Sequence, residues 1–149
     1  MDLQIVQQLA RGLMDRHGLE QWGLVFDRAR RRAGMTRYQE QVISLSRPLM
    51  QLYDENQVRD VILHEIAHAR VGTGHGHGAV WKQEARRLGT PPRASITEAP
   101  RPPAPYLGRC PSGHEVERFR LPRGARSCAT WSKGFDRRYL LTWYRVSAA

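Results

Sequence analysis

The sequence lacks the features that mark exported and membrane proteins. It has only two cysteines in 149 residues, Cys110 and Cys128, too few for a disulfide framework. No stretch approaches the roughly 20 apolar residues that span a bilayer. The N-terminus, Met1-Asp2-Leu3-Gln4, lacks the basic and then apolar pattern of a signal peptide. These absences favour a cytoplasmic protein with no membrane partner.

Acidic residues are scarce in the second part of the chain. Residues 1–85 hold 11 Lys and Arg against 10 Asp and Glu, whereas residues 86–149 hold 13 against 4. The first part therefore has the balance of an ordinary globular domain. The second part either binds a polyanion or has a basic surface exposed to solvent, and composition leaves both alternatives open.

Hydrophobic periodicity predicts a helix followed by three strands. Apolar residues recur at helical spacing from Leu3 to Met14, and His17-Gly18 ends the segment. Strands are predicted at about Trp22–Asp27, Met35–Tyr38 and Val42–Ser46, the last stopped by Pro48. One helix followed by a three-stranded antiparallel meander is the most economical arrangement of these elements.

Two further helices are expected after the strands. Asp54 is a suitable N-cap with Gln57 in a capping-box position, and the helix runs to about Gly72. A shorter helix covers about Ala79 to Leu88 and ends at Gly89.

The chain divides by composition into three regions. Residues 91–105 contain six of the nine prolines and predict a linker. The predicted domains are residues 1–90, this linker at 91–105, and a small β-rich unit at 106–149. No internal repeat is visible, and the fold class expected for the whole chain is α+β.

The sequence His64-Glu65-Ile66-Ala67-His68 carries the chemistry of a metal site. Residues i and i+4 of a helix lie on one face, so the two imidazoles can bind one cation. Glu65 can then accept a proton from a metal-bound water. This pattern predicts that His64 and His68 bind zinc and that Glu65 is the catalytic base.

A catalytic zinc usually has three protein ligands and one water. The glycine-rich tract after the helix offers His75 and His77, and its glycines let the chain approach a metal closely. Chemistry alone allows either histidine. Trp81 lies four residues beyond His77 and could brace that imidazole.

The sequence resembles the SprT-like zinc metallopeptidases, which include the eukaryotic protease Spartan. The likeness rests on His64-Glu65-Ile66-Ala67-His68 followed by Gly76-His77-Gly78-Ala79-Val80-Trp81. It implies a minimal zincin-like core of one helix, a three-stranded antiparallel sheet, an active-site helix and a third-ligand helix. It also implies that His77 is the third ligand, that one catalytic Zn²⁺ is bound, and that the substrate is a protein or peptide.

Other parts of a peptidase site are less well specified by the sequence. Peptide hydrolysis needs an oxyanion stabiliser, for which Tyr53, Tyr106 and nearby arginines are available. The edge of the small sheet beside the active-site helix is a plausible rail for an extended substrate.

The resemblance also implies a C-terminal zinc ribbon, usually built from two Cys-x-x-Cys turns. Here each turn has one cysteine, Cys110 and Cys128; His114 is a third candidate, and Trp131 stands where another cysteine would be. Three ligands do not close a structural tetrahedron. We therefore expect a ribbon without metal, with its core formed by aromatic residues, namely Trp131, Phe135, Tyr139 and Trp143.

Arginines alternate with aromatic residues in the same region. Such a mixture suits phosphates and stacked bases, and without a recognition helix any DNA binding would be independent of sequence. The candidate residues are Arg118, Arg120, Arg123, Arg126, Arg137 and Arg138.

Three functions remain open at this point. The first is a zinc endopeptidase that acts on DNA-associated proteins. The second is a DNA-binding or scaffolding protein in which zinc only stabilises the fold, although such a site would not need Glu65. The third is a repressor-cleaving metallopeptidase, a class that lacks the Gly-His-Gly-x-x-Trp tract.

Overall fold

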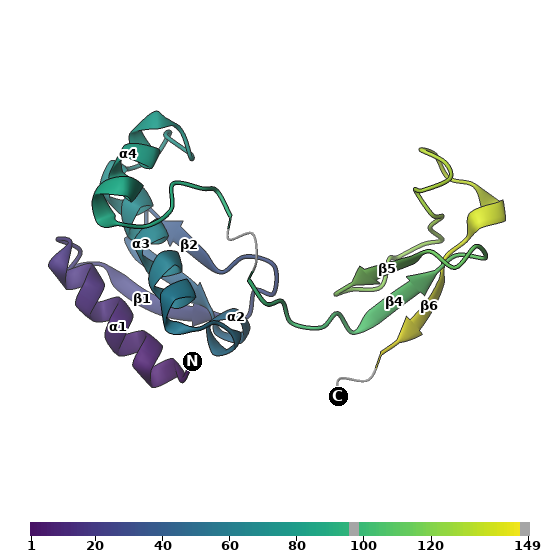
Figure 1. The fold of residues 1–149 in the computed structure, drawn as a ribbon, viewed down its shortest axis with the longest axis horizontal. Helices are drawn as coiled ribbons and strands as arrows, with labels where there is room; N and C mark the ends of the chain where they lie inside the picture. Colours follow the sequence, from purple (N-terminus) through teal and green to yellow (C-terminus); the bar gives the residue numbers. More distant parts are fainter. Residues whose placement is uncertain (96–98, 147–149) are drawn as a thin grey trace. The chain divides into compact units, whose positions relative to one another are not determined.

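The computed structural model describes residues 1–95 and 99–146. The chain forms two units, Met1–Pro102 and Pro103–Ala149 (Figure 1). Residues 96–98 of the predicted linker and residues 147–149 of the predicted C-terminal unit lie outside the described residues. The predicted α+β fold class is confirmed by helices and two small sheets.

The described part of the first unit contains four helices and one sheet. Their order is α1 (Leu3–Arg16), β1 (Gly23–Asp27), β2 (Gly34–Arg37), β3 (Val42–Ser46), α2 (Arg47–Leu52), α3 (Glu55–Val71) and α4 (Ala79–Leu88). Helices α1 and α3 pack against each other; α1 also contacts β1, and α3 contacts β2 and β3 (Figure 1). A continuous apolar core joins these elements, with Val6, Met14, Ile43, Leu45, Val58, Ile62 and Ile66 fully buried.

The predicted antiparallel meander is wrong in its strand order. Strand β3 lies in the centre, antiparallel to β2 but parallel to β1. The segment between β1 and β2 therefore crosses the end of β3 instead of forming a hairpin. Hydrogen bonds fix this crossing: Ser44 Oγ donates to Asp27, Ser46 Oγ donates to the Ala29 carbonyl, and the Ser46 amide donates to the Ala33 carbonyl.

Helix α2 was not expected from the sequence. The Ser46 side chain accepts a hydrogen bond from the Leu49 amide and caps this helix, and Pro48 lies in its first turn. Proline is tolerated there because the amides of the first turn have no partner within the helix. Pro48 thus belongs to the start of a helix and does not simply end a strand.

The second unit is a small antiparallel sheet with long turns. Its elements are β4 (Tyr106–Arg109), β5 (Glu115–Arg118), a 3₁₀ turn η1 (Arg137–Tyr139) and β6 (Thr142–Arg145). Strand β4 lies between β5 and β6. The expected aromatic core is wrong for two of its members, because Trp131 is 54% exposed and Phe135 is 61% exposed.

Among the described residues, no helix has the length and hydropathy needed to cross a lipid bilayer.

Candidate metal centre

Helix α3 holds two of the predicted ligands in a fixed position. Its N-terminus has the predicted capping box, in which the Asp54 side chain accepts from the Gln57 amide and the Gln57 side chain accepts from the Asp54 amide. The buried residues of α3 anchor it in the core. His64 and His68 are half-buried on one face of this helix. Their geometry is therefore set by the fold before any ligand binds.

The glycine-rich tract returns the chain to the same face and brings in His77. Gly74 and Gly76 have φ values of 85° and 48°, which favour glycine. The His77 Nε2 atom lies 3.0 Å from His64 Nε2 and 3.1 Å from His68 Nε2. His75 is exposed and does not belong to this cluster. The structure thus brings together His64, His68 and His77.

This arrangement fits a metal ion better than a network of hydrogen bonds. His77 Nε2 faces two other ring nitrogens, but it carries at most one proton and can donate to only one of them. Around a tetrahedral zinc with Zn–N bonds of about 2.0–2.1 Å, ligand nitrogens lie about 3.3 Å apart. The observed separations are close to that value. The donor set, three imidazoles, also suits zinc.

Trp81 supports all three imidazoles from helix α4. Its side chain is fully buried, and its ring centroid lies 4.6 Å from His64, 5.2 Å from His68 and 4.6 Å from His77. Helix α4 is held to α3 by an ion pair between Arg70 and Glu84. The bracing role predicted for Trp81 toward one histidine thus extends to the whole cluster.

The surroundings keep two of the histidines unprotonated. Burial, with smaller contributions from the other histidines of the cluster, lowers the pKa of His64 to about 3. Burial and the charge of His77 lower the pKa of His68 to about 4. Both imidazoles are therefore neutral near pH 7, which is the form that binds metals.

Glu65 points away from solvent, toward strand β2. It is 6% exposed, and Thr36 Oγ1 donates to its Oε2 atom at 2.8 Å. Gly34 leaves the room for it, because a Cβ atom on Gly34 would lie 2.7 Å from Glu65 Oε1. Gly34 and Thr36 alternate along β2 and so face the same side. The sequence analysis did not find either residue, since neither belongs to a motif and both lie about 30 positions before Glu65.

Burial raises the pKa of Glu65 to about 7, although the Thr36 hydrogen bond and the charge of Arg32 oppose the change. A carboxyl group with this pKa can both accept and release a proton near neutral pH. Tyr38 lies one residue beyond β2. Burial, and secondly the negative charge of Glu65, raise the pKa of its hydroxyl group.

The tyrosines suggested by the sequence lie elsewhere. Tyr53 is 6% exposed and ends helix α2, where its carbonyl accepts a hydrogen bond from the Met1 amino group. Tyr106 lies in β4 of the second unit. The sequence analysis placed Tyr38 at the end of a strand and did not propose it as an oxyanion donor.

The second unit brings its own three candidates together. Cys110, His114 and Cys128 place one ligand atom each within 4.8 Å of the others. The basic residues of this unit are exposed, namely Arg118, Arg120, Arg123, Arg126, Arg137 and Arg138. Arg138 pairs with Asp136 and also lies over the Tyr139 ring at 5.6 Å.

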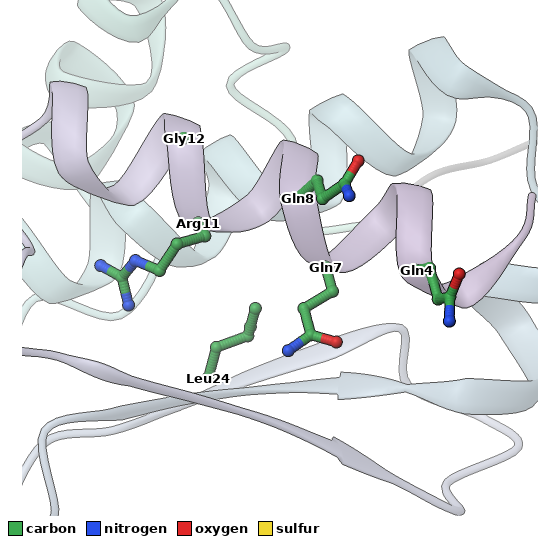
Figure 2. Close-up of a pocket in the computed structure, with 6 residues that line it drawn as sticks. All are labelled: Gln4, Gln7, Gln8, Arg11, Gly12 and Leu24. Carbon is green, nitrogen blue, oxygen red and sulfur yellow. The ribbon is translucent and has the colours of Figure 1, made fainter.

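A surface hollow in the first unit is separate from these clusters. Figure 2 shows it between α1 and β1. Arg11, which lines it, already donates to Asp15 and to the carbonyls of Leu19 and Trp22. None of the predicted site residues lines this hollow; the lining residues are Gln4, Gln7, Gln8, Arg11, Gly12 and Leu24.

Comparison with known proteins agrees with the geometry of the histidine cluster. The model of the SprT-like family matches residues 3–100, which include α1 to α4 and all three histidines. The chain belongs to the SprT-like family. No curated protein matches the sequence.

Membership confirms the resemblance inferred from the two motifs. The first unit is a metallopeptidase-like domain, and its candidate metal ligands and Glu65 lie within the matched SprT-like region. The match ends at residue 100, so the family model does not include the cysteine cluster of the second unit.

Proposed function

We propose that the SprT-like domain is a zinc-dependent peptidase with His64, His68 and His77 as metal ligands and Glu65 as the general base. The observation that carries this proposal is that His77 meets His64 and His68 beside helix α3, which also carries Glu65. A site that served only stability would not need a buried carboxyl group with a pKa of about 7 beside its ligands.

The side chains of the domain have separate tasks in this reaction. A bound zinc ion supplies Lewis acidity, which polarises a carbonyl group and makes water more acidic. Glu65 takes a proton from the attacking water and later delivers it to the amine leaving group. Thr36 holds the Glu65 carboxylate through its hydroxyl group, and Gly34 leaves space for it.

Strand β2 is the best candidate for binding an extended substrate. Among the described strands it pairs with β3 alone, so its other edge is open to another strand. It also contacts α3 and carries Thr36, which bonds to Glu65. A peptide added along this edge would form main-chain hydrogen bonds beside the site. Tyr38, just beyond the end of the strand, is our candidate for the oxyanion donor, because its hydroxyl group can donate a hydrogen bond and lies near enough to Glu65 to interact with its charge.

DNA-associated proteins are the substrate class that we propose. The second unit supports this choice with exposed arginines and with exposed rings, including Trp131 and Phe135. Exposed rings stack on bases, and arginines bind phosphates without reading sequence. The same features favour the second candidate function, a DNA-binding scaffold without peptidase activity.

The experiment that tests the peptidase compares the wild type with Glu65→Gln. Both zinc-loaded proteins are incubated with casein and with a DNA-bound protein, with and without single-stranded DNA. We expect Glu65→Gln to keep its zinc and its helical circular dichroism while cleavage falls by about 10²- to 10⁴-fold. Glu20→Gln, a matched change on an exposed residue, should leave cleavage unchanged.

Two results would contradict the peptidase. Cleavage by Glu65→Gln at the wild-type rate would remove Glu65 from the reaction. A wild-type protein that is fully loaded with zinc and cleaves nothing under any of these conditions would favour the scaffold.

A further inference from the structure

The second unit has almost no apolar core of its own. Within its described part, residues 103–146, the buried hydrophobic residues are Ala104, Cys110 and Cys128. The large side chains Trp131 and Phe135 are more than half exposed. A unit of this size rarely folds by hydrophobic burial alone and usually needs a disulfide or a metal.

The two cysteines are buried where such a link would lie. Cys110 follows β4 and His114 precedes β5, and the turn between them closes through the Cys110 amide, which donates to the His114 carbonyl at 3.0 Å. Cys128 comes from a distant segment, and its amide donates to the Tyr139 carbonyl at 2.9 Å. The cluster therefore joins the β4–β5 turn to the chain before β6.

The ligand atoms of this cluster converge on one point. His114 Nδ1 lies 3.6 Å from Cys110 Sγ and 3.8 Å from Cys128 Sγ. All three atoms lie within 4.8 Å of one another. Zinc binds sulfur at about 2.3 Å and nitrogen at about 2.0–2.1 Å, so tetrahedral ligands are about 3.5–3.8 Å apart. The observed separations fit a shared zinc ion.

The Cys128 turn is also shaped to stabilise a thiolate. The Cys128 sulfur accepts hydrogen bonds from the side chain and amide of Thr130 and from the amide of Trp131. Amides two and three residues after a cysteine point at its sulfur in this geometry. In a Cys-x-x-Cys turn the second cysteine stands three residues after the first, and at that position this chain has Trp131.

We propose that the second unit binds one Zn²⁺ through Cys110 Sγ, Cys128 Sγ and His114 Nδ1, with an exchangeable fourth position filled by water or a small thiol. Two thiolates balance the charge of the ion, and thiolate with imidazole is a donor set that selects zinc. This site differs from a four-cysteine ribbon because one coordination position is not closed by a protein ligand. It replaces the missing apolar core, and the aromatic core expected from the sequence is not needed.

The first test is the metal content of the full, reduced chain. Zinc analysis should give two ions per chain for the wild type and one for Cys110→Ser, Cys128→Ser and His114→Ala. Ser112→Ala, an exposed change inside the same turn, should keep two. Cobalt in place of zinc should give a thiolate charge-transfer band in the near-ultraviolet that Cys128→Ser removes and His77→Ala keeps.

A second variant keeps the test valid if the cysteine variants do not fold. Trp131→Cys supplies the missing ligand at an exposed position, so it should keep two zinc ions and hold the second at least tenfold more tightly against a chelator. One zinc ion per wild-type chain that Cys128→Ser keeps and His77→Ala loses, or a disulfide between Cys110 and Cys128 in the reduced preparation, would overturn the proposal. A stoichiometry that rises from one to two only in Trp131→Cys would also overturn it.

Discussion

The two candidate metal clusters of this chain differ in what surrounds them. The histidine cluster is built on α3, whose buried residues pack in a continuous core with α1 and the sheet. The cysteine cluster lies between turns of a unit in which three hydrophobic residues of the described part are buried. We therefore expect the first unit to keep its fold without a metal, and the second unit to depend on the metal that we propose for it.

This contrast gives different tasks to the two metals that we propose. Where packing already fixes the ligands, binding energy is not needed for folding and the metal can serve a reaction. Where packing is missing, binding energy becomes folding energy. Two observations agree with this division. A buried acid, Glu65, lies beside the histidines, whereas the described cysteine cluster consists of two cysteines and one histidine and contains no acid.

The largest effect should come from the third histidine. His77→Ala leaves two ligands, so the first zinc should bind at least 100-fold more weakly and cleavage should be lost, while helical circular dichroism stays unchanged. His75→Ala, a matched change two residues away on an exposed side chain, should alter neither. Zinc analysis and cleavage assays measure both. Loss of zinc in His75→Ala but not in His77→Ala would reverse the ligand assignment. Unfolding of His77→Ala would contradict the expectation that the first unit folds without its metal.

The next effect concerns the stability of the metal-free chain with Glu65→Gln. The pKa of Glu65 rises from 4.5 to about 7 on folding, so the folded chain holds an extra proton between these pH values. The stability that this proton contributes is complete below pH 4.5 and is lost as the pH rises through 7. Relative to Glu65→Gln, the wild type should therefore lose on the order of 3 kcal/mol between pH 4.5 and pH 8.

Urea unfolding followed by the helical circular dichroism signal measures this difference. The described α-helices all lie in the first unit, so the signal reports on that unit. Because the other titrating groups are common to both proteins, their contributions cancel. A difference that does not change with pH would show that Glu65 is not buried as described.

A smaller effect is expected from Gly34→Ala. The new Cβ atom would lie 2.7 Å from Glu65 Oε1, so Glu65 must move, at a cost of about 1–3 kcal/mol in unfolding free energy. Cleavage should fall while zinc stays bound. Gly12→Ala is the matched control: its Cβ would meet nothing within 4 Å, and alanine in helix α1 should stabilise the chain by up to about 1 kcal/mol. Equal effects of the two variants would contradict the close packing of Glu65.

The sequence predicted the parts of this structure that depend on local patterns. Helices α1, α3 and α4 have apolar periodicity, and the capping box of α3 is readable from Asp54 and Gln57. Helix α2 also had a local signal, an N-cap Ser46 followed by Pro48 in the first turn. The sequence analysis missed it because it interpreted Pro48 as the end of the preceding strand. His64 and His68 were visible from their helical spacing, whereas the glycine tract offered both His75 and His77, and the family resemblance selected His77.

The missed features all depend on contacts between distant residues. The parallel pairing of β1 and β3 is accompanied by hydrogen bonds from Ser44 to Asp27 at the end of β1 and from Ser46 to Ala29 in the crossing segment. The space that Gly34 leaves for Glu65 has no local signature. In the second unit, composition suggested an aromatic core, but the sheet is too small to cover Trp131 and Phe135.

The most direct test of the contrast is an NMR spectrum of the ¹⁵N-labelled full chain before and after both metals are removed with a strong chelator. The account predicts that amide signals of the first unit remain dispersed while those of the second unit collapse, and that added zinc restores both the spectrum and cleavage. Collapse of both units together, or no change in the second unit, would contradict it.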